Sequence, residues 1–284
     1  MSGAATNGNA AGENRPGEKL LVVDRVSRNF GGLAAVTDFS LHLDPGELVG
    51  LIGPNGAGKT TCFNLVTGVY CPTNGQIRMA GRRIDGLPPV KINHAGIART
   101  FQNIRLFQNL TVLDNVLVGF NRSAEHGLLR TVLRTPKFAR ERAAAESRGM
   151  GLLRTLRLDD KAAFVAKNLP YGDQRRLEIA RALATGPKIL LLDEPAAGMN
   201  PQEKGELMEL IRFIRDRFGV GILLIEHDMK LVMSVCDRIT VLDHGETIAV
   251  GTPQDVQCNR DVIEAYLGEP VSDAELPCAD PEKA

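Results

Sequence analysis

The sequence predicts an α/β fold with a mainly parallel core sheet, and three features of the chain carry that prediction. Residues 48–52, 189–192 and 220–225 are continuous apolar runs, as strands covered on both faces require. Segments with helical periodicity follow these runs, and such alternation gives parallel strands joined by crossover helices. A glycine-rich turn connects the first run to its helix.

The composition limits the possible function classes. A chain of 284 residues can bury a large core, and its 34 basic and 34 acidic side chains give a net charge of zero. The chain therefore has no overall excess of positive charge that would indicate binding to a nucleic acid or to an anionic membrane surface. The first residues lack the apolar segment of a signal peptide, and no stretch reaches the ~20 apolar residues that span a bilayer. We therefore expect a cytosolic protein whose membrane contacts are peripheral.

The five cysteines are scattered along the chain and form no C-x-x-C pair. This spacing argues against a zinc site and against a disulfide scaffold. We expect ordinary core or surface thiols, with Cys62 packed in the helix that follows the glycine-rich turn.

Residues 48–67 organise the rest of the chain. The pattern G-x-x-x-x-G-K-[ST] lies between a predicted strand and a predicted helix, which is the context that a phosphate-binding loop requires. The candidate phosphate-binding residues are Gly53, Pro54, Asn55, Gly56, Ala57, Gly58, Lys59, Thr60 and Thr61.

The chemistry of a polyphosphate explains these residue types. Glycines allow backbone N–H groups to turn inward around the negative charge, and the N-terminus of the next helix adds further donors. Lys59 can bridge the β- and γ-phosphates, Thr60 can place its hydroxyl on Mg²⁺, and Thr61 can reach the α-phosphate. The loop therefore predicts a site for ATP with Mg²⁺.

The chain before and just after this loop is predicted to be rich in strands. Residues 1–18 are small and polar, and we expect a disordered tail. Strands are expected at residues 20–26 and 38–44, with Phe30 in the turn between them, where its ring could stack on a purine or anchor the loop. After the first helix, the expected elements are a strand at residues 75–80, a short helix at 88–94, and a strand at 97–101 that leads into Gln102.

A helical region follows. The segment 110–120 is predicted to be a helix. Residues 123–158 lack β signals and are rich in Ala, Arg, Leu and Glu, so helix is expected there too, interrupted near Pro136 and at residues 149–151. We expect a helical subdomain, about residues 103–186, inserted between two strands of one sheet.

The second half of the chain alternates strands and helices again. An amphipathic helix is expected at residues 201–218 and is stopped by Gly219. Residues 269–284 are acidic and contain proline, so we expect a solvated tail. Between them, the expected elements are a helix at residues 229–236, a hairpin with strands at 238–242 and 247–250, and short helices up to residue 267.

Charged side chains follow two of the buried runs. Asp193 and Glu194 follow one run, and His227 follows the other. The carboxyl ends of parallel strands share one edge of a sheet, where ligands bind in open α/β folds, so these side chains should meet the phosphate loop. There Asp193 can orient Mg²⁺, Glu194 can take a proton from the water that attacks the γ-phosphate, and His227 can hold that water.

The stretch LPYGDQRRLEIARALA at residues 169–184 begins a strongly helical segment just after a short loop. In this order with the phosphate loop, Gln102, the Asp-Glu pair and His227, it resembles the signature of ATP-binding cassette (ABC) proteins. The resemblance implies an ABC ATPase domain over residues 19–268. It also implies an N-terminal antiparallel β region beside the parallel sheet, with the helical subdomain inserted.

The resemblance implies roles for further residues. Phe30 would stack on adenine, and Gln102 would contact Mg²⁺ and the attacking water and would sense a membrane subunit. Gly198 and Asn200 would lie in a loop at the seam between two cassettes, which pair head to tail around ATP. A nucleotide held by the second cassette would meet the signature residues Leu169, Tyr171, Gly172, Asp173 and Gln174.

The chain departs from the family pattern in the signature and in the loop after Glu194. Pro170 and Tyr171 replace the usual serine and glycine, and proline offers a phosphate neither a hydroxyl nor an N–H, although it suits the first turn of a helix. Asn200 replaces the commoner aspartate, which removes a charge from the seam. We therefore expect this composite site to be weaker than that of its partner.

These motifs and the helical region around residues 123–157 together resemble the ATP-binding subunits of bacterial branched-chain amino-acid uptake transporters. In that family the subunit pairs with a second cassette and works with two membrane permeases and a periplasmic binding protein. The resemblance implies a place on the cytoplasmic face of the inner membrane. Homodimeric pairing, related systems for urea, short amides or other amino acids, and lipopolysaccharide export stay open.

Other classes of function fit less well. Soluble cassette proteins that act on ribosomes or DNA usually carry two cassettes or long coiled-coil insertions, and this chain has neither. Its balanced charge also offers no site for a polyanion. A small-molecule kinase with the same loop would leave the signature and His227 without a role. Phosphate transfer to an acceptor would indicate the kinase, and ATP hydrolysis without one would indicate the transporter.

Overall fold

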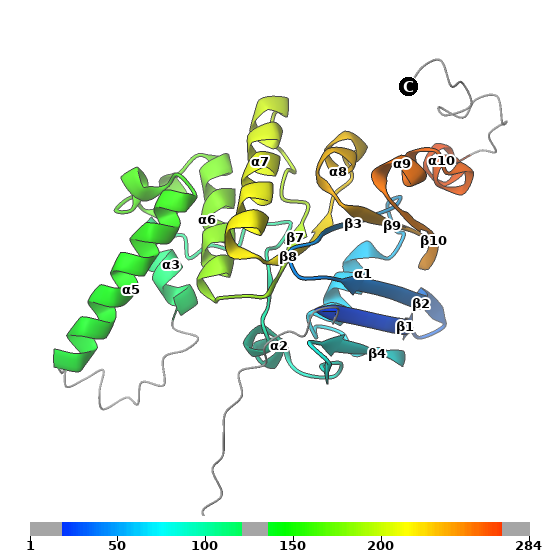
Figure 1. The fold of residues 1–284 in the computed structure, drawn as a ribbon, viewed down its shortest axis with the longest axis horizontal. Coiled ribbons are helices and arrows are strands. Elements are labelled where there is room, and N and C mark those ends of the chain that lie inside the picture. Colours follow the sequence, from blue (N-terminus) through cyan, green and yellow to red (C-terminus); the bar gives the residue numbers. More distant parts are fainter. Residues whose placement is uncertain (1–18, 121–135, 269–284) are drawn as a thin grey trace, which may run out of the picture.

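The computed structural model describes residues 19–120 and 136–268, which form two sheets with helices around them (Figure 1). The tails expected at residues 1–18 and 269–284 lie outside the described residues. In spatial order the larger sheet consists of β10 (Glu246–Gly251), β9 (Arg238–Asp243), β3 (Leu48–Ile52), β8 (Gly221–Ile225), β7 (Ile189–Asp193) and β6 (Ile97–Arg99). The smaller sheet consists of β2 (Leu33–Leu43), β1 (Leu21–Phe30), β4 (Asn74–Met79) and β5 (Arg82–Arg83).

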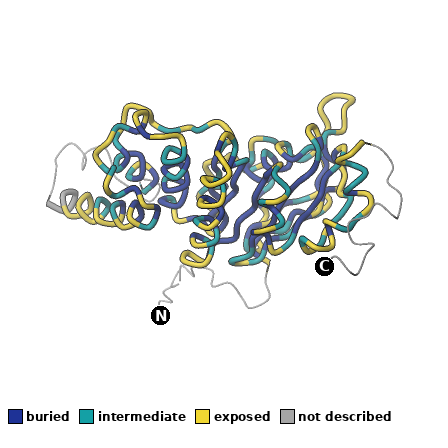
Figure 2. The backbone as a smooth tube through the Cα atoms, turned by 90° about the horizontal axis from the view of Figure 1, so that it is seen from above, coloured by how far each residue is buried: buried dark blue, intermediate teal, exposed yellow. Residues whose placement is uncertain are grey.

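The larger sheet is parallel from β9 to β6, and only β10 joins it in the antiparallel sense. The smaller sheet is antiparallel throughout. Every residue of β3, β7 and β8 is buried, as the continuous apolar runs predicted, and these strands form the dark centre of the tube in Figure 2. The predicted α/β fold with a mainly parallel core sheet and an N-terminal antiparallel region is confirmed.

Helices connect the strands of the core sheet and cover it (Figure 1). Asn200 caps one of them, because its side chain accepts a hydrogen bond from the Glu203 N–H while Glu203 bonds back to the Asn200 N–H. The helices are α1 (Lys59–Val66), α2 (Pro89–Ala95), α3 (Val112–Phe120), α5 (Pro136–Thr155), α6 (Tyr171–Ala184), α7 (Pro201–Phe218), α8 (Met229–Val235), α9 (Pro253–Gln257) and α10 (Arg260–Leu267).

Between β6 and β7 the described residues include the helices α3, α5 and α6, and α3 packs against both α5 and α6. The first part of the helix expected at residues 123–158, up to residue 135, lies outside the described residues. The predicted break at residues 149–151 is wrong, because α5 runs through it without interruption. Two glycines weaken a helix by only ~1 kcal/mol each, and packing compensates. A Cβ on Gly149 would lie 3.0 Å from Leu113 Cδ1, so this glycine allows α5 to approach α3 closely.

Gly119 plays the same role where α3 meets α6, and its replacement gives a stability prediction. A Cβ there would lie 2.6 Å from Arg181 O and 2.7 Å from Ala184 Cβ. We expect Gly119→Ala to lower the free energy of unfolding by about 1–3 kcal/mol through overpacking. The matched control is Gly205→Ala in α7, where the new methyl meets nothing within 4 Å. Urea titration should show a gain of about 0.4–1 kcal/mol for that control, and equal effects of the two changes would contradict the packing argument.

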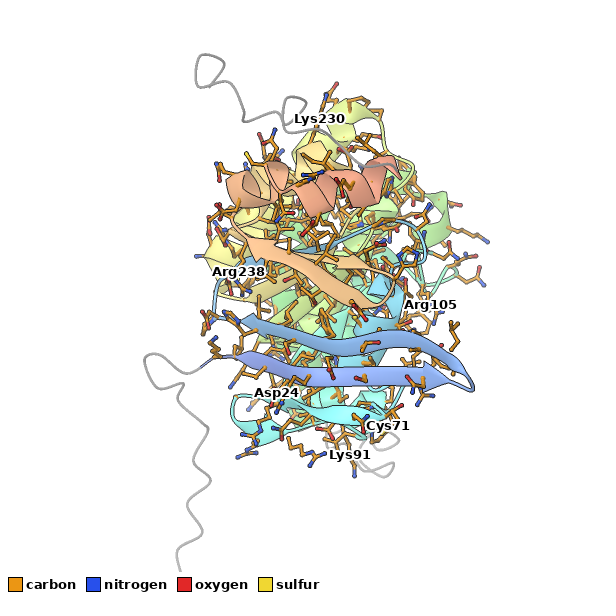
Figure 3. The ribbon with its side chains drawn as sticks, turned by 90° about the vertical axis from the view of Figure 1, so that its right-hand side faces the viewer. Asp24, Cys71, Lys91, Arg105, Lys230 and Arg238 are labelled. Atoms are coloured by element: carbon orange, nitrogen blue, oxygen red, sulfur yellow. The ribbon has the colours of Figure 1, made fainter. Side chains whose placement is uncertain are left out.

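The smaller sheet lies beside the β9–β10 hairpin (Figure 3) and together they hold the loop between β3 and α1. The N–H of Gly245, in the hairpin turn, donates to Ala57 O, and the N–H of Thr37 in β2 donates to Gly245 O. At the opposite end of the hairpin, labelled in Figure 3, the Arg238 guanidinium binds Glu47 and His42 O. The hairpin turn therefore connects the loop after β3 to β2 of the smaller sheet.

The cysteine expectation is only partly right. Cys62 and Cys236 are buried free thiols, and burial raises the pKa of each. Cys258, in contrast, is disulfide-bonded. Cysteine spacing did not predict this bond because the partner of a cysteine is set by proximity in space.

Candidate nucleotide site

Neighbouring strands of the core sheet end at one edge, and each delivers predicted site residues there. The strand β3 leads into the phosphate loop, β8 into His227, β7 into Asp193 and Glu194, and β6 toward Gln102. The register pairs Asp193 with Ile225, so the ends of β7 and β8 are level. The topology of the sheet therefore gathers groups that lie far apart in the sequence.

The phosphate loop has a backbone form that glycine adopts readily. Gly53, Gly56 and Gly58 have φ angles of 148°, 84° and 100°. A Cβ on Gly53 would lie 2.0 Å from Leu242 O, and one on Gly58 would lie 2.8 Å from Ala35 O. No side chain caps the N-terminus of α1. Its first N–H groups are therefore available to an anion.

The remaining residues of the phosphate loop differ in how far they are buried. Ala57 is buried, and its carbonyl accepts the hydrogen bond from Gly245. Asn55, Gly56 and Thr60 are exposed, while Pro54 and Thr61 are partly buried. The polar atoms of Thr60 and Asn55 are thus accessible to a ligand.

The ammonium group of Lys59 lies inside this loop. The side chain is buried, and Nζ donates to Gly53 O at 2.7 Å and to Pro54 O at 2.8 Å. Burial lowers the pKa of Lys59, and the nearby carboxylates of Glu194 and Asp193 oppose this shift. The arrangement places one positive charge where phosphate oxygens would approach.

Glu194, Gln102 and His227 meet at the sheet edge. The Gln102 Nε2 donates to Glu194 Oε2 at 2.9 Å, and His227 Nδ1 lies 3.9 Å from the same oxygen. Glu194 has a φ of 44°, a left-handed conformation that is rare for a residue with a side chain. Backbone strain of this kind accompanies functional groups that the surrounding structure holds in place.

Asp193 forms a buried ion pair that the sequence did not reveal. Its Oδ2 lies 2.7 Å from Arg99 Nη2, with side-chain exposures of 7% and 9%. Arg99 also donates to Asn64 Oδ1 in α1 at 2.7 Å. The guanidinium therefore fixes the Asp193 carboxylate relative to the helix that follows the phosphate loop.

Glu226 is a second group that sequence reasoning missed. It is buried beside His227, and its carboxylate accepts hydrogen bonds from the N–H groups of Ala196 and His227. Burial raises the pKa of Glu226 and these two hydrogen bonds oppose the shift. It ties the loop after Glu194 to the end of β8. A polar residue directly after a buried strand was the available signal.

Tyr266, near the end of α10, also reaches the phosphate loop. The nearby backbone of Gly53 lowers the pKa of Tyr266, whereas burial raises it more. Nothing in the sequence signals this proximity, because Gly53 and Tyr266 lie near opposite ends of the described chain.

Phe30 ends β1 and is 39% exposed. Its ring makes an edge contact with Tyr70 at 5.1 Å between centroids, and the Arg28 guanidinium lies 4.7 Å from its centre. The exposed ring could stack on a base, while its contacts also fit the alternative expectation of a loop anchor.

The signature residues lie at the start of α6, in the helical region and away from α1 (Figure 1). Pro170 is the N-cap residue, Tyr171 is exposed, and a Cβ on Gly172 would meet nothing within 4 Å. The surface around Gly172 therefore has room for a group from outside this molecule.

Other signature side chains are buried or form hydrogen bonds and ion pairs with residues of the same chain. Leu169 is buried in the core, and Gln174 Nε2 donates to its carbonyl at 2.8 Å. Asp173 pairs with Lys161 at 2.6 Å. These side chains support the loop, so an outside nucleotide would meet mainly the backbone and Tyr171.

The loop after Glu194 passes next to the signature. A Cβ on Gly198 would lie 3.8 Å from the Tyr171 ring, and Gly198 has a φ of 77°. Asn200 uses its side chain to cap α7. The predicted dimer loop and the signature thus form one continuous surface.

The residues present fit Mg²⁺ bound together with a nucleotide. Within residues 19–120 and 136–268, no cluster of three or more His, Cys, Asp or Glu side chains could hold a metal ion. Mg²⁺ in nucleotide sites usually takes one or two carboxylates and completes its shell with phosphate oxygens and water. Thr60 and Asp193 offer a hydroxyl and a carboxylate at the edge that carries the phosphate loop.

Residues 36–197 match the family model described as ABC transporter. The chain belongs to the ABC transporter family. It is an ATP-binding and ATP-hydrolysing cassette of that family. A second family model, described as branched-chain amino acid ATP-binding cassette transporter, matches residues 246–272 of the cassette.

Curated relatives resemble the cassette over most of its length. The high-affinity branched-chain amino acid transport ATP-binding protein LivG of Salmonella typhimurium is 51% identical over 252 residues, which cover 89% of this chain and 99% of that protein. The corresponding BraF of Pseudomonas aeruginosa is 48% identical and covers 88% of this chain and 98% of its own. The lipopolysaccharide export ATP-binding protein LptB of Haemophilus influenzae is 34% identical, with 88% and 98% coverage.

Solved structures resemble the cassette as well. A nucleotide-free ATP-binding cassette from an ABC transporter has a TM-score of 0.76 and 28% identity, and it covers 89% of this chain and all of its own. A cassette in its ADP conformation gives a TM-score of 0.76 at 27% identity, with coverage of 89% and 100%. No helix among residues 19–120 and 136–268 of our cassette is both long and apolar enough to cross a bilayer.

Proposed function

We propose that this chain is the ATP-hydrolysing subunit of a bacterial importer for branched-chain amino acids. The observation that carries the proposal is the 51% identity to a branched-chain amino acid transport protein, against 34% to a lipopolysaccharide export protein of similar coverage. The match of residues 246–272 to a branched-chain amino acid cassette model supports the same solute class.

Uptake by cells tests the solute. Deletion of the gene should lower uptake of labelled leucine, isoleucine and valine, and the wild-type chain should restore it. A chain with Glu194→Gln should fail to restore it at equal abundance. Unchanged uptake of all three amino acids after deletion, or a specific loss of urea or amide uptake, would contradict the proposed solute.

We further propose that the cassette lies on the cytoplasmic face of the inner membrane. There it would contact two permease subunits and a second cassette, which is a homologue or another copy. A periplasmic binding protein would act indirectly, through the permeases. The surface formed by Tyr171, Gly172 and Gly198 supports the cassette partner, because it carries nucleotide-binding family motifs but lies outside this chain's own phosphate loop.

The proposed mechanism begins with phosphate binding by the loop and helix α1. The loop N–H groups and Lys59 would hold the phosphates, and Lys59 would exchange its contacts to Gly53 O and Pro54 O for phosphate oxygens. Thr60 and Asp193 would hold Mg²⁺, which supplies charge neutralisation when bound. Arg99 keeps the Asp193 carboxylate in place for this task.

Glu194 would then accept the proton of the attacking water. Its contact with Gln102 and its proximity to His227 place three polar groups around that position. Gln102 would orient the water and contact Mg²⁺, and His227 would donate to the γ-phosphate. Phe30 would stack on adenine at the other end of the nucleotide.

The second cassette would complete the site. The start of α6 with Tyr171 and Gly172 would face the γ-phosphate held by the partner, and Gly198 and Asn200 would lie at the seam. Asp173 and Gln174 would support this surface through Lys161 and Leu169 O. Hydrolysis would cleave the γ-phosphoryl group from ADP, and its departure as inorganic phosphate would remove the group that joins the two cassettes, so they would separate.

Gln102→Ala tests the proposed sensing role. We expect the variant to transport less amino acid per ATP hydrolysed while its ATP affinity changes less, because the side chain contacts Glu194 and not the phosphate loop. Nucleotide binding, ATP hydrolysis and uptake should be measured with the assembled transporter. Gln254→Ala, on the exposed face of α9, is the control. A loss confined to ATP binding would count against a sensing role.

A further inference from the structure

The helix α6 contains a buried ion pair between Arg175 and Glu178. Arg175 and Glu178 lie one turn apart, with side-chain exposures of 0% and 1%, and Arg175 Nη1 donates to Glu178 Oε2 at 2.9 Å. Burial of two charges is expensive, and an apolar pair would fill the same space without that penalty. The pair therefore calls for an explanation other than packing.

The remaining hydrogen bonds of Arg175 go to the segment that follows β6. Nη1 donates to Phe101 O at 2.6 Å, and Nη2 donates to Gln102 O at 2.8 Å. Both carbonyls of this turn are thus held by one guanidinium, whose planar geometry allows parallel hydrogen bonds.

Glu178 binds the N–H groups of the same segment, residues 101–105. Its Oε1 accepts from Phe101 N at 3.4 Å and from Arg105 N at 3.2 Å. Arg105, labelled in Figure 3, also stacks its guanidinium over the Phe101 ring at 4.1 Å. The chain from Phe101 to Arg105 is therefore fastened to α6 by charged hydrogen bonds on both sides of Gln102.

These hydrogen bonds connect the signature to Glu194. At one end Arg175 Nη2 donates to the Tyr171 hydroxyl at 3.1 Å, within the signature. At the other end the side chain of Gln102 donates to Glu194 at 2.9 Å. A continuous path of hydrogen bonds runs from the signature, through Arg175, to Glu194.

We propose that Arg175, oriented by Glu178, is a positioning residue that fixes Gln102 to the first turn of α6. A shift of the signature helix, caused by a nucleotide on the second cassette, then moves Gln102 and changes its contact with Glu194. This rests on the proposed function only for the position of the second cassette. The residue is fully buried and acts through Gln102.

The test compares Arg175→Lys with the matched control Arg176→Lys, using complexes purified through a tag on the full chain. Lysine keeps the charge but cannot hold both carbonyls and Glu178 together. Arg176 is the adjacent arginine and pairs with Glu206 at the surface of α7. We expect Arg175→Lys to lower kcat at least about tenfold with KM for ATP within about twofold, and Arg176→Lys to change neither.

A double-mutant cycle separates positioning from general structure. In the Gln102→Ala background, Arg175→Lys should cause no further loss of kcat, because the hydrogen bond that links Gln102 to Glu194 has been removed. Losses that multiply in the double variant would overturn the proposal. So would a rise of KM equal to the fall of kcat.

A second variant covers the case in which Arg175→Lys does not fold. The double change Arg175→Met with Glu178→Met removes the charges together, and such apolar replacements of buried pairs usually keep stability. We expect this variant to unfold near the wild-type temperature and to show the same loss of kcat. Full activity, or failure of both variants to fold, would assign the pair to stability alone and overturn the proposal. The readout is ATP hydrolysis without added solute, so an error in the amino-acid assignment would not affect it.

Discussion

Replacing Glu194 by glutamine is expected to lower kcat for ATP hydrolysis about 10²- to 10⁴-fold, the contribution typical of a positioned general base. The amide keeps the size of the carboxylate and can still meet Gln102, which lies 2.9 Å away in the wild-type chain. It cannot accept a proton from water. ATP affinity should therefore stay within about twofold of wild type in an equilibrium titration.

The same variant should accumulate as a nucleotide-bound dimer, because binding proceeds while the step that separates the cassettes does not. Size-exclusion chromatography with and without ATP measures this. Glu209→Gln, an exposed glutamate of α7, is the matched control and should behave as wild type. Turnover that survives Glu194→Gln would place the general base elsewhere.

Replacing Lys59 by alanine is expected to abolish retention of ATP. The ammonium is the cation that the structure places inside the phosphate loop, where it now bonds to two carbonyls. Each hydrogen bond from a charged group contributes about 1.5–3 kcal/mol, so loss of two phosphate contacts should weaken binding at least about a hundredfold. Equilibrium binding of a fluorescent ATP analogue measures the change.

The control for this experiment is Lys91→Ala. Lys91 is an exposed lysine of α2 and lies at the lower rim of the molecule in Figure 3, away from the phosphate loop. Its removal changes net charge by the same amount as Lys59→Ala. If both variants retain wild-type ATP affinity, the loop lysine does not hold phosphate as proposed.

Much of the fold and of the site could be predicted because the signals are local. The strand β3, the glycine-rich turn and α1 follow one another in the sequence, so spacing alone identified the loop. The apolar runs of β7 and β8 predicted buried parallel strands, and parallel strands necessarily end at one edge. The sequence therefore predicts that Asp193, Glu194 and His227 lie together.

Other features depend on contacts between distant segments. Arg99 carries no motif, yet it holds Asp193 from a strand 94 residues earlier. Gly149 and Gly151 predicted a break in α5, but close packing on α3 outweighs the weak helix preference of glycine. Glu226 enters the site through a hydrogen bond from the Ala196 N–H, 30 positions away in the sequence.

By itself the sequence determined the order of strands and helices, the phosphate loop and the identity of the acidic and histidine groups beside it. These depend on periodicity, on glycine and on residue type, which act over a few neighbouring positions. The tertiary structure decided which side chains support that site, above all the joining of Arg175 and Glu178 to the backbone at Gln102. Such support arises from burial, which makes each charged group bind whatever polar atoms the folded chain brings within reach.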